Sequence, residues 1–431
     1  MRKHRFIFAV LAIVLAFSMV SMLTGCGGGT GGTKKAPKSA VTIGIINPQT
    51  GPLAGFGEGE DWIDQQILDY VNNTMGGINF ADYGVKLPLK IVVYDSQSDT
   101  TQCTQLAQKL IQQDTVDMVV VRHTPDTVNP VTAICERYQE PCVAFDAPVD
   151  AWLAAAPDGG YQWTYHSWWT LDQMYDQYKA LWTQAGFAPS ADVKIGTLFS
   201  NDADGTAWAG IFNPNIQSDG YTLVDPGTYP DGTQDFSSII QQFMTAGVTI
   251  VCGTNTNPDF ATFWRQCRQL GFQPKFVTMG KAYLLQSDAD AIGADLMDGL
   301  CGETWWDPGY PFKSSLTGLT PADLAQKYQT ASNRQITQPM GDKYASLEIA
   351  VDALSRAGSL DKTAIRDAIG ATNLDTIFGH IQFNDKHYCE TKLAGGQWQV
   401  DAQGNLHLYV VNNSLHTDLP TTGTLKPLTY K

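Results

Sequence analysis

Short apolar runs alternate along the chain with segments whose apolar residues recur at helical spacing. In the first part of the chain, apolar runs of strand length lie at 41–46, 89–94, 116–121 and 142–145. Between the first two runs, segment 61–71 repeats apolar residues every three or four positions, the period of an amphipathic helix. Strands that alternate with helices at this pace predict a parallel α/β sheet.

The same alternation starts again after about residue 165. Further strands are expected at 193–199, 221–224, 248–252, 276–277 and 377–383. Further helices are expected at 235–244, 259–270 and 344–357, and a hairpin over 397–411. The aromatic segment 161–169 lies between the two alternations, so the pattern predicts two α/β units joined there.

The first residues have the pattern of an export signal. A basic start containing Arg2, Lys3 and Arg5 precedes an apolar run over 6–20, which is shorter than the about 20 residues of a membrane span. The sequence Leu-Thr-Gly-Cys ending at Cys26 resembles the lipobox of bacterial lipoproteins, whose cysteine receives a diacylglyceryl group. We therefore predict a signal peptide over 1–25 and lipidation of Cys26. An ordinary secretory signal with an incidental cysteine is the alternative.

The residues after Cys26 are rich in glycine and have nothing to pack, so 26–40 is predicted to be a flexible, lipid-anchored linker. The formal charge is −15, and the three basic residues of the signal contribute +3, which leaves −18 for the mature chain. Such acidity argues against nucleic acid or anionic lipid as a partner. Membrane contact is expected through the lipid alone, at the cell surface or in a periplasm.

Seven of the eight cysteines remain once Cys26 is lipidated. An exported protein can keep disulfides, and Cys135 and Cys142 are close enough in sequence to form the candidate pair. An odd count leaves at least one thiol unpaired. The sequence has no Cys-x-x-Cys and no Cys/His cluster with zinc spacing, so neither a metal nor a cofactor is expected.

Several motifs, taken in their order and spacing, resemble one protein family between Val41 and Asp385. The most specific motif is the stretch Ile43 to Gly57, and the others are Tyr94-Asp95, Asn129-Pro130, 186–199, 235–247, 264–271 and 375–379. Together they are similar to the leucine/isoleucine/valine-binding proteins, the receptors of branched-chain amino-acid-type ABC importers. The family fold, periplasmic binding protein type I, has two Rossmann-like α/β lobes with parallel sheets, joined by three crossover strands.

The resemblance implies where the lobes begin and end. Lobe 1 is expected over 41–165 plus 305–380, and lobe 2 over 166–304 plus 381–431, with crossovers near 163–169, 302–306 and 378–384. Ligands of such sheets bind outside the carboxyl ends of the strands, and here the lobes are expected to close on a small ligand.

The resemblance implies ligand contacts in two turns of lobe 1. Phe56 stands where the family has an aromatic over the ligand side chain, unless it packs on its own lobe. In the run from Thr124 to Thr127, family hydroxyls and N–H groups hold a carboxylate. Pro125 replaces the usual serine, so Thr124 or Thr127 is expected to substitute. Asp126 either receives a cation or caps the helix.

Two further segments of lobe 1 are candidates. After the strand 142–145, Asp146 and Ala147 fall where the family clasps an ammonium, and Pro148 replaces a threonine. Asp146 neutralises an ammonium or caps a turn. His166 lies at the first crossover among aromatic residues that either wall a pocket or pack the hinge. Those aromatic residues are Trp152, Tyr161, Trp163, Tyr165, Trp168 and Trp169, and Trp305 and Trp306 lie at the second crossover.

In lobe 2 the resemblance points to three positions. Asp204 stands where the family often has an aromatic, and the calcium frame that Asp202 begins is incomplete because Asn213 occupies the glutamate position. Thr256 belongs to a polar cleft edge. Lys281 stands where the family has the acidic partner of the ligand ammonium. A lysine there suits an anionic ligand group, and the alternative is a solvated loop lysine.

These observations predict an extracytoplasmic solute receptor of an ABC importer that delivers an amino acid, or a related small acid or amide, to a membrane permease. It is expected to act as a monomer. The alternatives are a receptor for an aromatic or carboxylate compound, or the sensor subunit of a signalling protein. No nucleophile elbow, zinc spacing or P-loop supports an enzyme.

Overall fold

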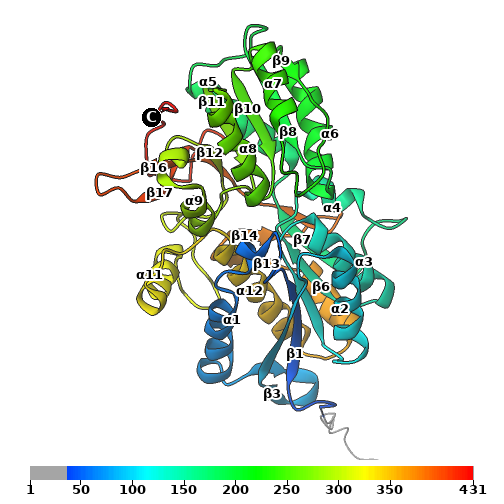
Figure 1. Ribbon diagram of the computed structural model, residues 1–431. Helices are drawn as coiled ribbons and strands as arrows, with labels where there is room; N and C mark the ends of the chain where they lie inside the picture. The colour runs from blue at the N-terminus through cyan, green and yellow to red at the C-terminus, as the bar shows by residue number, and fades with distance from the viewer. Residues whose placement is uncertain (1–35, 431) are drawn as a thin grey trace, which may run out of the picture.

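The computed structural model describes residues 36–430, so the predicted signal peptide and Cys26 lie outside the described residues. The chain forms two lobes (Figure 1), the first mainly blue, cyan and orange and the second mainly green and red. Among the described residues, no helix combines the length and the apolar character needed to cross a membrane.

The first lobe is built on a sheet of the order β15-β7-β6-β5-β1-β4, in which every described pair is parallel. Its strands are β1 (Val41–Asn47), β4 (Leu89–Asp95), β5 (Met118–Val121), β6 (Cys142–Phe145), β7 (Thr164–Trp168) and β15 (Tyr388–Glu390). The strands β5, β6 and β7 are wholly buried, which explains the continuous apolar runs of β5 and β6.

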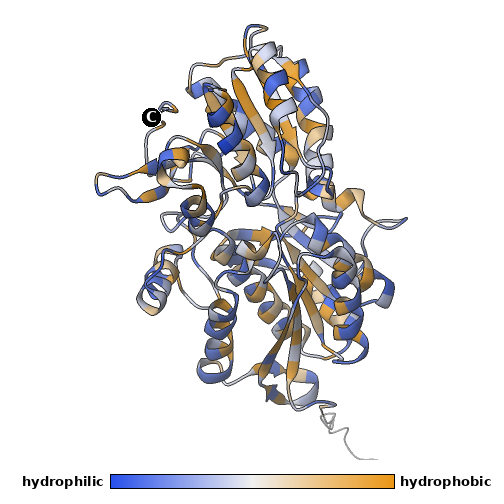
Figure 2. Cartoon of the chain, in the orientation of Figure 1, coloured by the Kyte–Doolittle hydropathy of each residue, from blue (hydrophilic) through white to orange (hydrophobic). Residues whose placement is uncertain are grey.

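Helices cover both faces of this sheet. They are α1 (Glu60–Asp69), α2 (Thr100–Gln112), α3 (Pro125–Tyr138), α4 (Val149–Ala154), α11 (Pro321–Ser332), α12 (Pro339–Ala357) and α13 (Lys362–Gly370). Two small hairpins complete the lobe: β2 (Ile78–Phe80) with β3 (Val85–Leu87), and β13 (Asn373–Thr376) with β14 (Gly379–Gln382). Apolar strands lie inside and hydrophilic helix faces outside (Figure 2).

The second lobe has a sheet of the order β17-β16-β12-β11-β10-β8-β9. The strands from β12 to β9 in this order pair in parallel, whereas β16 pairs antiparallel with both β12 and β17. Its strands are β8 (Lys194–Phe199), β9 (Thr222–Val224), β10 (Ile250–Thr254), β11 (Phe276–Gly280), β12 (Cys301–Thr304), β16 (Ala394–Val400) and β17 (Leu406–Asn412). Its helices are α5 (Leu171–Gln184), α6 (Ala203–Ser218), α7 (Ser237–Ala246), α8 (Asn257–Leu270), α9 (Gln286–Ile292) and α10 (Ala294–Met297).

The crossings between the sheets differ from the expected boundaries. Strand β7 lies wholly in the first sheet, so the first crossing follows Trp168 rather than residue 165. The third crossing follows Glu390 rather than residue 380, because β15 pairs with the edge strand β7. The strand expected over 377–383 is confirmed at Gly379–Gln382, but its start is wrong, since Ile377 and Phe378 form the turn between β13 and β14.

The disulfide expected between Cys135 and Cys142 is absent, and both residues are free thiols. The two cysteines lie in the apolar core between α3 and β6, where they pack as small hydrophobic side chains. Burial, followed by a hydrogen bond with Cys142, raises the pKa of the Cys135 thiol well above its ordinary value.

Candidate ligand-binding cleft

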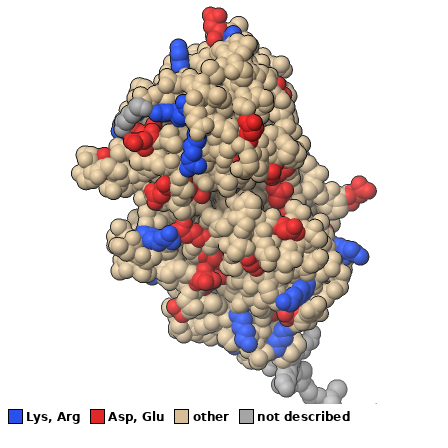
Figure 3. Space-filling model, in the orientation of Figure 1, with Lys and Arg blue, Asp and Glu red and all other residues tan. Residues whose placement is uncertain are grey.

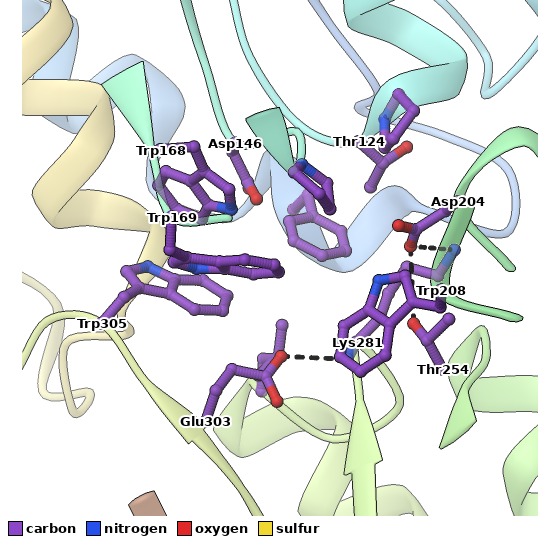
Figure 4. A pocket seen from close by; sticks show the side chains of 14 residues that line it. Thr124, Asp146, Trp168, Trp169, Asp204, Trp208, Thr254, Lys281, Glu303 and Trp305 are labelled. Carbon is purple, nitrogen blue, oxygen red and sulfur yellow. Dashed lines mark hydrogen bonds and ion pairs between the residues drawn. The ribbon is translucent and has the colours of Figure 1, made fainter. Parts of the chain in front are cut away.

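A cavity lies between the lobes, where the carboxyl ends of strands from both sheets meet (Figure 4). Its empty space, including the part that is open to solvent, is about 300 Å³. Lobe 1 contributes Phe56, Thr124, Pro125, Asp146, Pro148, Trp168 and Trp169. Lobe 2 and the second crossing contribute Asp204, Trp208, Thr254, Lys281, Leu284, Glu303 and Trp305. Figure 3 shows acidic side chains gathered along the waist of the molecule, around a hollow.

Seven of the twelve ligand contacts expected from the sequence line this cavity together. They are Phe56, Thr124, Pro125, Asp146, Pro148, Asp204 and Lys281. The segments that carry them follow β1, β5, β6, β8 and β11, so the parallel sheets bring to one place residues that are far apart in sequence.

Five other ligand contacts expected from the sequence lie outside the lining, namely Asp126, Thr127, Ala147, His166 and Thr256. His166 is fully buried, stacks on Trp152 at 4.9 Å, and bonds through Nε2 to the carbonyl of Ala147 at 2.7 Å. Burial lowers the pKa of His166 to about 4, so its neutral Nε2–H donates to that carbonyl. His166 and Ala147 therefore stabilise the Asp146–Pro148 turn from the side away from the cavity, and neither faces the cavity.

The remaining three lie at helix starts. Thr127 is buried within α3, and Thr256 is the residue before α8. Asp126 is half-buried in the first turn of α3. Burial and the carboxylate of Asp202 in the other lobe raise the pKa of Asp126 to about 6, and the Lys281 ammonium acts in the opposite direction.

Four tryptophans form a continuous aromatic wall across the lobe junction. The rings of Trp168 and Trp305 are 5.0 Å apart at 61°, and those of Trp168 and Trp169 are 5.7 Å apart. Trp169 meets Trp208 edge-on, at 88° and 6.1 Å. The sequence indicated three of these residues. Trp208 was missed, although it stands one helical turn after Asp204 on α6 and so shares its face.

Lys281 differs from its expected role. Its Nζ lies 3.0 Å from Asp202 and 3.1 Å from Asp204, and all three side chains are buried. Burial disfavours the ammonium, but the two carboxylates outweigh it and raise the pKa of Lys281 well above its ordinary value. Because its charge is already neutralised, Lys281 is not the free partner of an anionic ligand that the sequence suggested.

Glu303 on β12 is the second lining residue that sequence reasoning missed. Its Oε2 accepts a hydrogen bond from the Tyr178 hydroxyl at 2.6 Å, and Oε1 accepts one from the Lys281 backbone N–H at 3.3 Å. A glutamate inside a four-residue strand that is otherwise apolar or small was the available signal, because such positions are rarely charged without a reason.

A buried cluster of side chains contacts Asp146. His123 Nδ1 lies 2.7 Å from Asp146 Oδ2 and 3.9 Å from Asp342 Oδ2, a grouping tight enough for a metal ion. Burial, with Lys343 and Arg122 next, lowers the pKa of His123 well below its ordinary value. Since those two cations already supply positive charge there, we interpret the cluster as a hydrogen-bonded support.

Arg122 and Lys343 belong to a fully buried network of ion pairs. Arg122 Nη1 lies 2.5 Å from Glu60 Oε1, and Lys343 Nζ lies 3.4 Å from Glu60 Oε2. Arg122 also donates to Ser346 Oγ at 2.8 Å, and Asn47 donates to Glu60 at 3.0 Å. The network ties β1, α1 and α12 to the turn that carries Thr124.

The family model described as periplasmic binding protein matches residues 40–405. The chain belongs to the periplasmic binding protein family. A curated relative, Leu/Ile/Val-binding protein homolog 8 of Brucella abortus (strain 2308), is 25% identical over 374 residues, 83% of this chain and 88% of that protein. The resemblance to the leucine/isoleucine/valine-binding proteins is thereby confirmed.

Solved structures confirm the predicted α/β fold of this periplasmic binding protein. The leucine binding protein LivK of Thermotoga maritima MSB8 aligns with a TM-score of 0.72 at 18% identity, over 86% of this chain and 97% of that one. A solute binding protein of an R. palustris ABC transporter, in complex with 4-hydroxybenzoate, aligns with a TM-score of 0.70 at 16% identity, over 90% and 98% of the two chains.

The two lobes of this periplasmic binding protein touch at the mouth of the cleft. Ser287 Oγ of lobe 2 donates to Glu58 Oε2 of lobe 1 at 3.4 Å. A methyl group added to Gly55 would meet the Cδ1 atom of Leu285 at 2.3 Å, so a larger residue requires this side chain to shift. The lobes are therefore closed on the cavity.

Gly55→Ala is expected to weaken ligand affinity by roughly 5- to 150-fold, because overpacking at the closed interface costs about 1–3 kcal/mol. Neither lobe should lose stability, since the clash exists only between lobes. Gly210→Ala, on an open face of α6 with no atom within 4 Å, is the matched control. Calorimetric titration and small-angle scattering measure affinity and closure. Equal affinities for the two variants would contradict closure at this contact.

Glu303→Gln is expected to flatten the pH dependence of stability. Burial raises the pKa of Glu303 from 4.5 to about 7, so the folded protein binds an extra proton between these values. This contribution to stability is complete below pH 4.5 and is lost as pH rises through 7, a fall of about 1–3 kcal/mol. Urea unfolding at pH 5 and pH 8 should show a smaller difference for the variant than for wild type.

Proposed function

We propose that this protein is the extracytoplasmic receptor of an ABC importer, closing its lobes on a small polar organic ligand and delivering it to the membrane permease. The observation that carries the proposal is the cavity at the carboxyl ends of both sheets, lined from both lobes and closed by the contacts of Gly55 and Glu58. An amino acid, or a related acid or amide, is the first ligand class to test. An aromatic or carboxylate compound is the second.

The relatives support a receptor role without fixing the ligand. They include a Leu/Ile/Val-binding protein homolog and a protein in complex with 4-hydroxybenzoate, and these ligands differ in charge and shape. Here Pro125 and Lys281 alter the positions that the family resemblance links to a carboxylate and an ammonium. The four tryptophans give the cleft its own aromatic wall.

A thermal-shift screen tests the proposal. Leucine, isoleucine, acetamide, 4-hydroxybenzoate and small amines are added singly, and a ligand at 100 times its dissociation constant should stabilise the fold by about 2.7 kcal/mol. Deleting the gene should abolish high-affinity uptake of that ligand. Binding with unchanged uptake would favour the sensor role, and binding with turnover of the ligand would indicate an enzyme.

Cys26→Ala is expected to move the protein from the membrane fraction to the soluble extracytoplasmic fraction. We propose that Cys26 carries two acyl chains and that this lipid is the only attachment to the membrane. Fractionation followed by immunoblotting measures the distribution. A variant that stays with the membrane would show that Cys26 is not the anchor.

A further inference from the structure

The cleft lining has more carboxyl groups than basic groups. Asp146, Asp204 and Glu303 each present a carboxyl group to the cavity, whereas Lys281 is the only cationic side chain of the lining. The Lys281 ammonium is already paired with Asp204 and with Asp202 behind it. A ligand that brings a positive charge would therefore balance the site, and a second anion would worsen the imbalance.

The aromatic rings are arranged at angles to one another. Trp169 and Trp208 stand at 88° and Trp168 and Trp305 at 61°, whereas Trp168 and Trp169 are tilted by 37°, so the four rings form an angled aromatic wall beside the cavity (Figure 4). Aromatic rings attract cations through their negative faces, and aromatic walls hold quaternary ammonium groups. The carboxyl groups of Asp146 and Glu303 lie around the same space.

At least one oxygen of each carboxyl group is already engaged. Asp146 Oδ2 bonds His123 at 2.7 Å, Asp204 Oδ2 contacts Lys281 at 3.1 Å, and Glu303 Oε2 accepts from Tyr178 at 2.6 Å. A primary ammonium needs several free acceptors for its three N–H groups. A methylated ammonium needs only negative potential and aromatic surface, which this site offers.

The indole N–H groups add a second requirement. Those of Trp168, Trp169 and Trp305 are buried and have no acceptor within residues 36–430. Buried donors are almost always satisfied, and an indole can only donate. An oxygen atom of a bound ligand would satisfy one or more of them.

We infer that the ligand is a methylated ammonium compound that also carries a hydroxyl or carboxylate oxygen. This inference rests on the receptor function proposed above and specifies its substrate class. The ammonium methyl groups pack on the tryptophan wall beside the carboxyl groups, and the oxygen accepts from an indole N–H. Burial raises the pKa values of Asp146 and Asp204, and a bound cation favours their ionised forms.

Paired ligands that differ only in charge test the inference. Choline is compared with 3,3-dimethyl-1-butanol, and trimethylglycine with 3,3-dimethylbutanoate, by calorimetric titration of the full chain. In each pair a carbon replaces the charged nitrogen and the shape is kept. The cationic member of at least one pair should bind about 30-fold more tightly, equivalent to ~2 kcal/mol. Equal or reversed affinities in both pairs would overturn the inference.

Variants of Trp169 locate the cation. Trp169→Leu should weaken binding of the cationic probe at least 10-fold, and Trp169→Phe should weaken it less, because phenylalanine keeps an aromatic face. Trp62→Phe is the control, since Trp62 lies on α1 against Tyr328, outside the lining. Equal losses for the leucine and phenylalanine variants, at equal unfolding temperatures, would contradict a cation–aromatic contact.

The outcomes separate this inference from the receptor proposal. Tight binding of leucine or 4-hydroxybenzoate, without binding of either ammonium probe, would overturn the ligand class and leave the receptor function intact. If none of the screened compounds binds and the lobes show no ligand-dependent closure, both proposals fail.

Discussion

Replacing Glu60 with alanine is expected to lower the free energy of unfolding by about 3–5 kcal/mol. The change leaves the Arg122 guanidinium and the Lys343 ammonium fully buried without their carboxylate partner. Uncompensated buried charge is far more costly than a lost surface ion pair. Because Arg122 precedes the turn with Thr124, ligand affinity should fall as well. Urea unfolding and calorimetric titration measure the two effects.

Asp352→Ala is the control for this experiment. Asp352 pairs with Arg356 one helical turn away at 2.6 Å, but both side chains are partly exposed, so its loss should cost less than about 1 kcal/mol. The double variant Glu60→Leu with Arg122→Met removes two opposite charges together and should regain part of the stability. Equal costs for Glu60→Ala and Asp352→Ala would show that the network does not carry the predicted energy.

Lys281→Met is expected to cost about 3–5 kcal/mol of unfolding free energy at neutral pH. It leaves the buried carboxyl groups of Asp202 and Asp204 facing each other without the ammonium that lies 3.0 and 3.1 Å from them. The cost should shrink as pH falls and the aspartates protonate. Binding of any ligand should weaken too, because the chain from Gly280 onward shapes the cavity. Urea unfolding at pH 4 and pH 7 tests this pattern.

Lys179→Met provides a close match for Lys281→Met. Lys179 also lies between two aspartates, Asp176 and Asp219, each at 3.0 Å, but its side chain is 30% exposed. Water screens this arrangement, so its loss should cost less than about 1 kcal/mol. A cost for Lys281→Met as small as that for Lys179→Met would indicate that Asp202 and Asp204 are solvated or neutral in the folded protein.

The regular elements of the fold followed closely from local patterns. The run predicted at 142–145 is the strand Cys142–Phe145, and the hairpin predicted over 397–411 is β16 paired with β17. Local patterns failed where a strand is not a simple apolar run. Thr164–Trp168 mixes hydroxyl, imidazole and aromatic side chains, and it becomes a buried strand because β6 and β15 pair with it on either side.

The candidate site was predicted only in part. Residues in turns after apolar strands, such as Asp146 and Lys281, could be placed at the cleft because parallel strands end at one edge. Trp208 lies inside a helix and Glu303 inside a strand, so neither residue has the position in a turn after a strand that indicated the others. The free thiols of Cys135 and Cys142 show the opposite error, since closeness in sequence says nothing about whether two thiols join.

The sequence by itself determined the alternation of strands and helices, the two α/β units, the family resemblance and the export pattern ending at Cys26. These depend on local periodicity and on motifs that are read along the chain. Only the tertiary structure decided that Lys281 is neutralised by Asp202 and Asp204, and that four tryptophans face one space with three carboxyl groups. Charge balance and aromatic geometry depend on distances between segments far apart in sequence, and folding alone sets those distances.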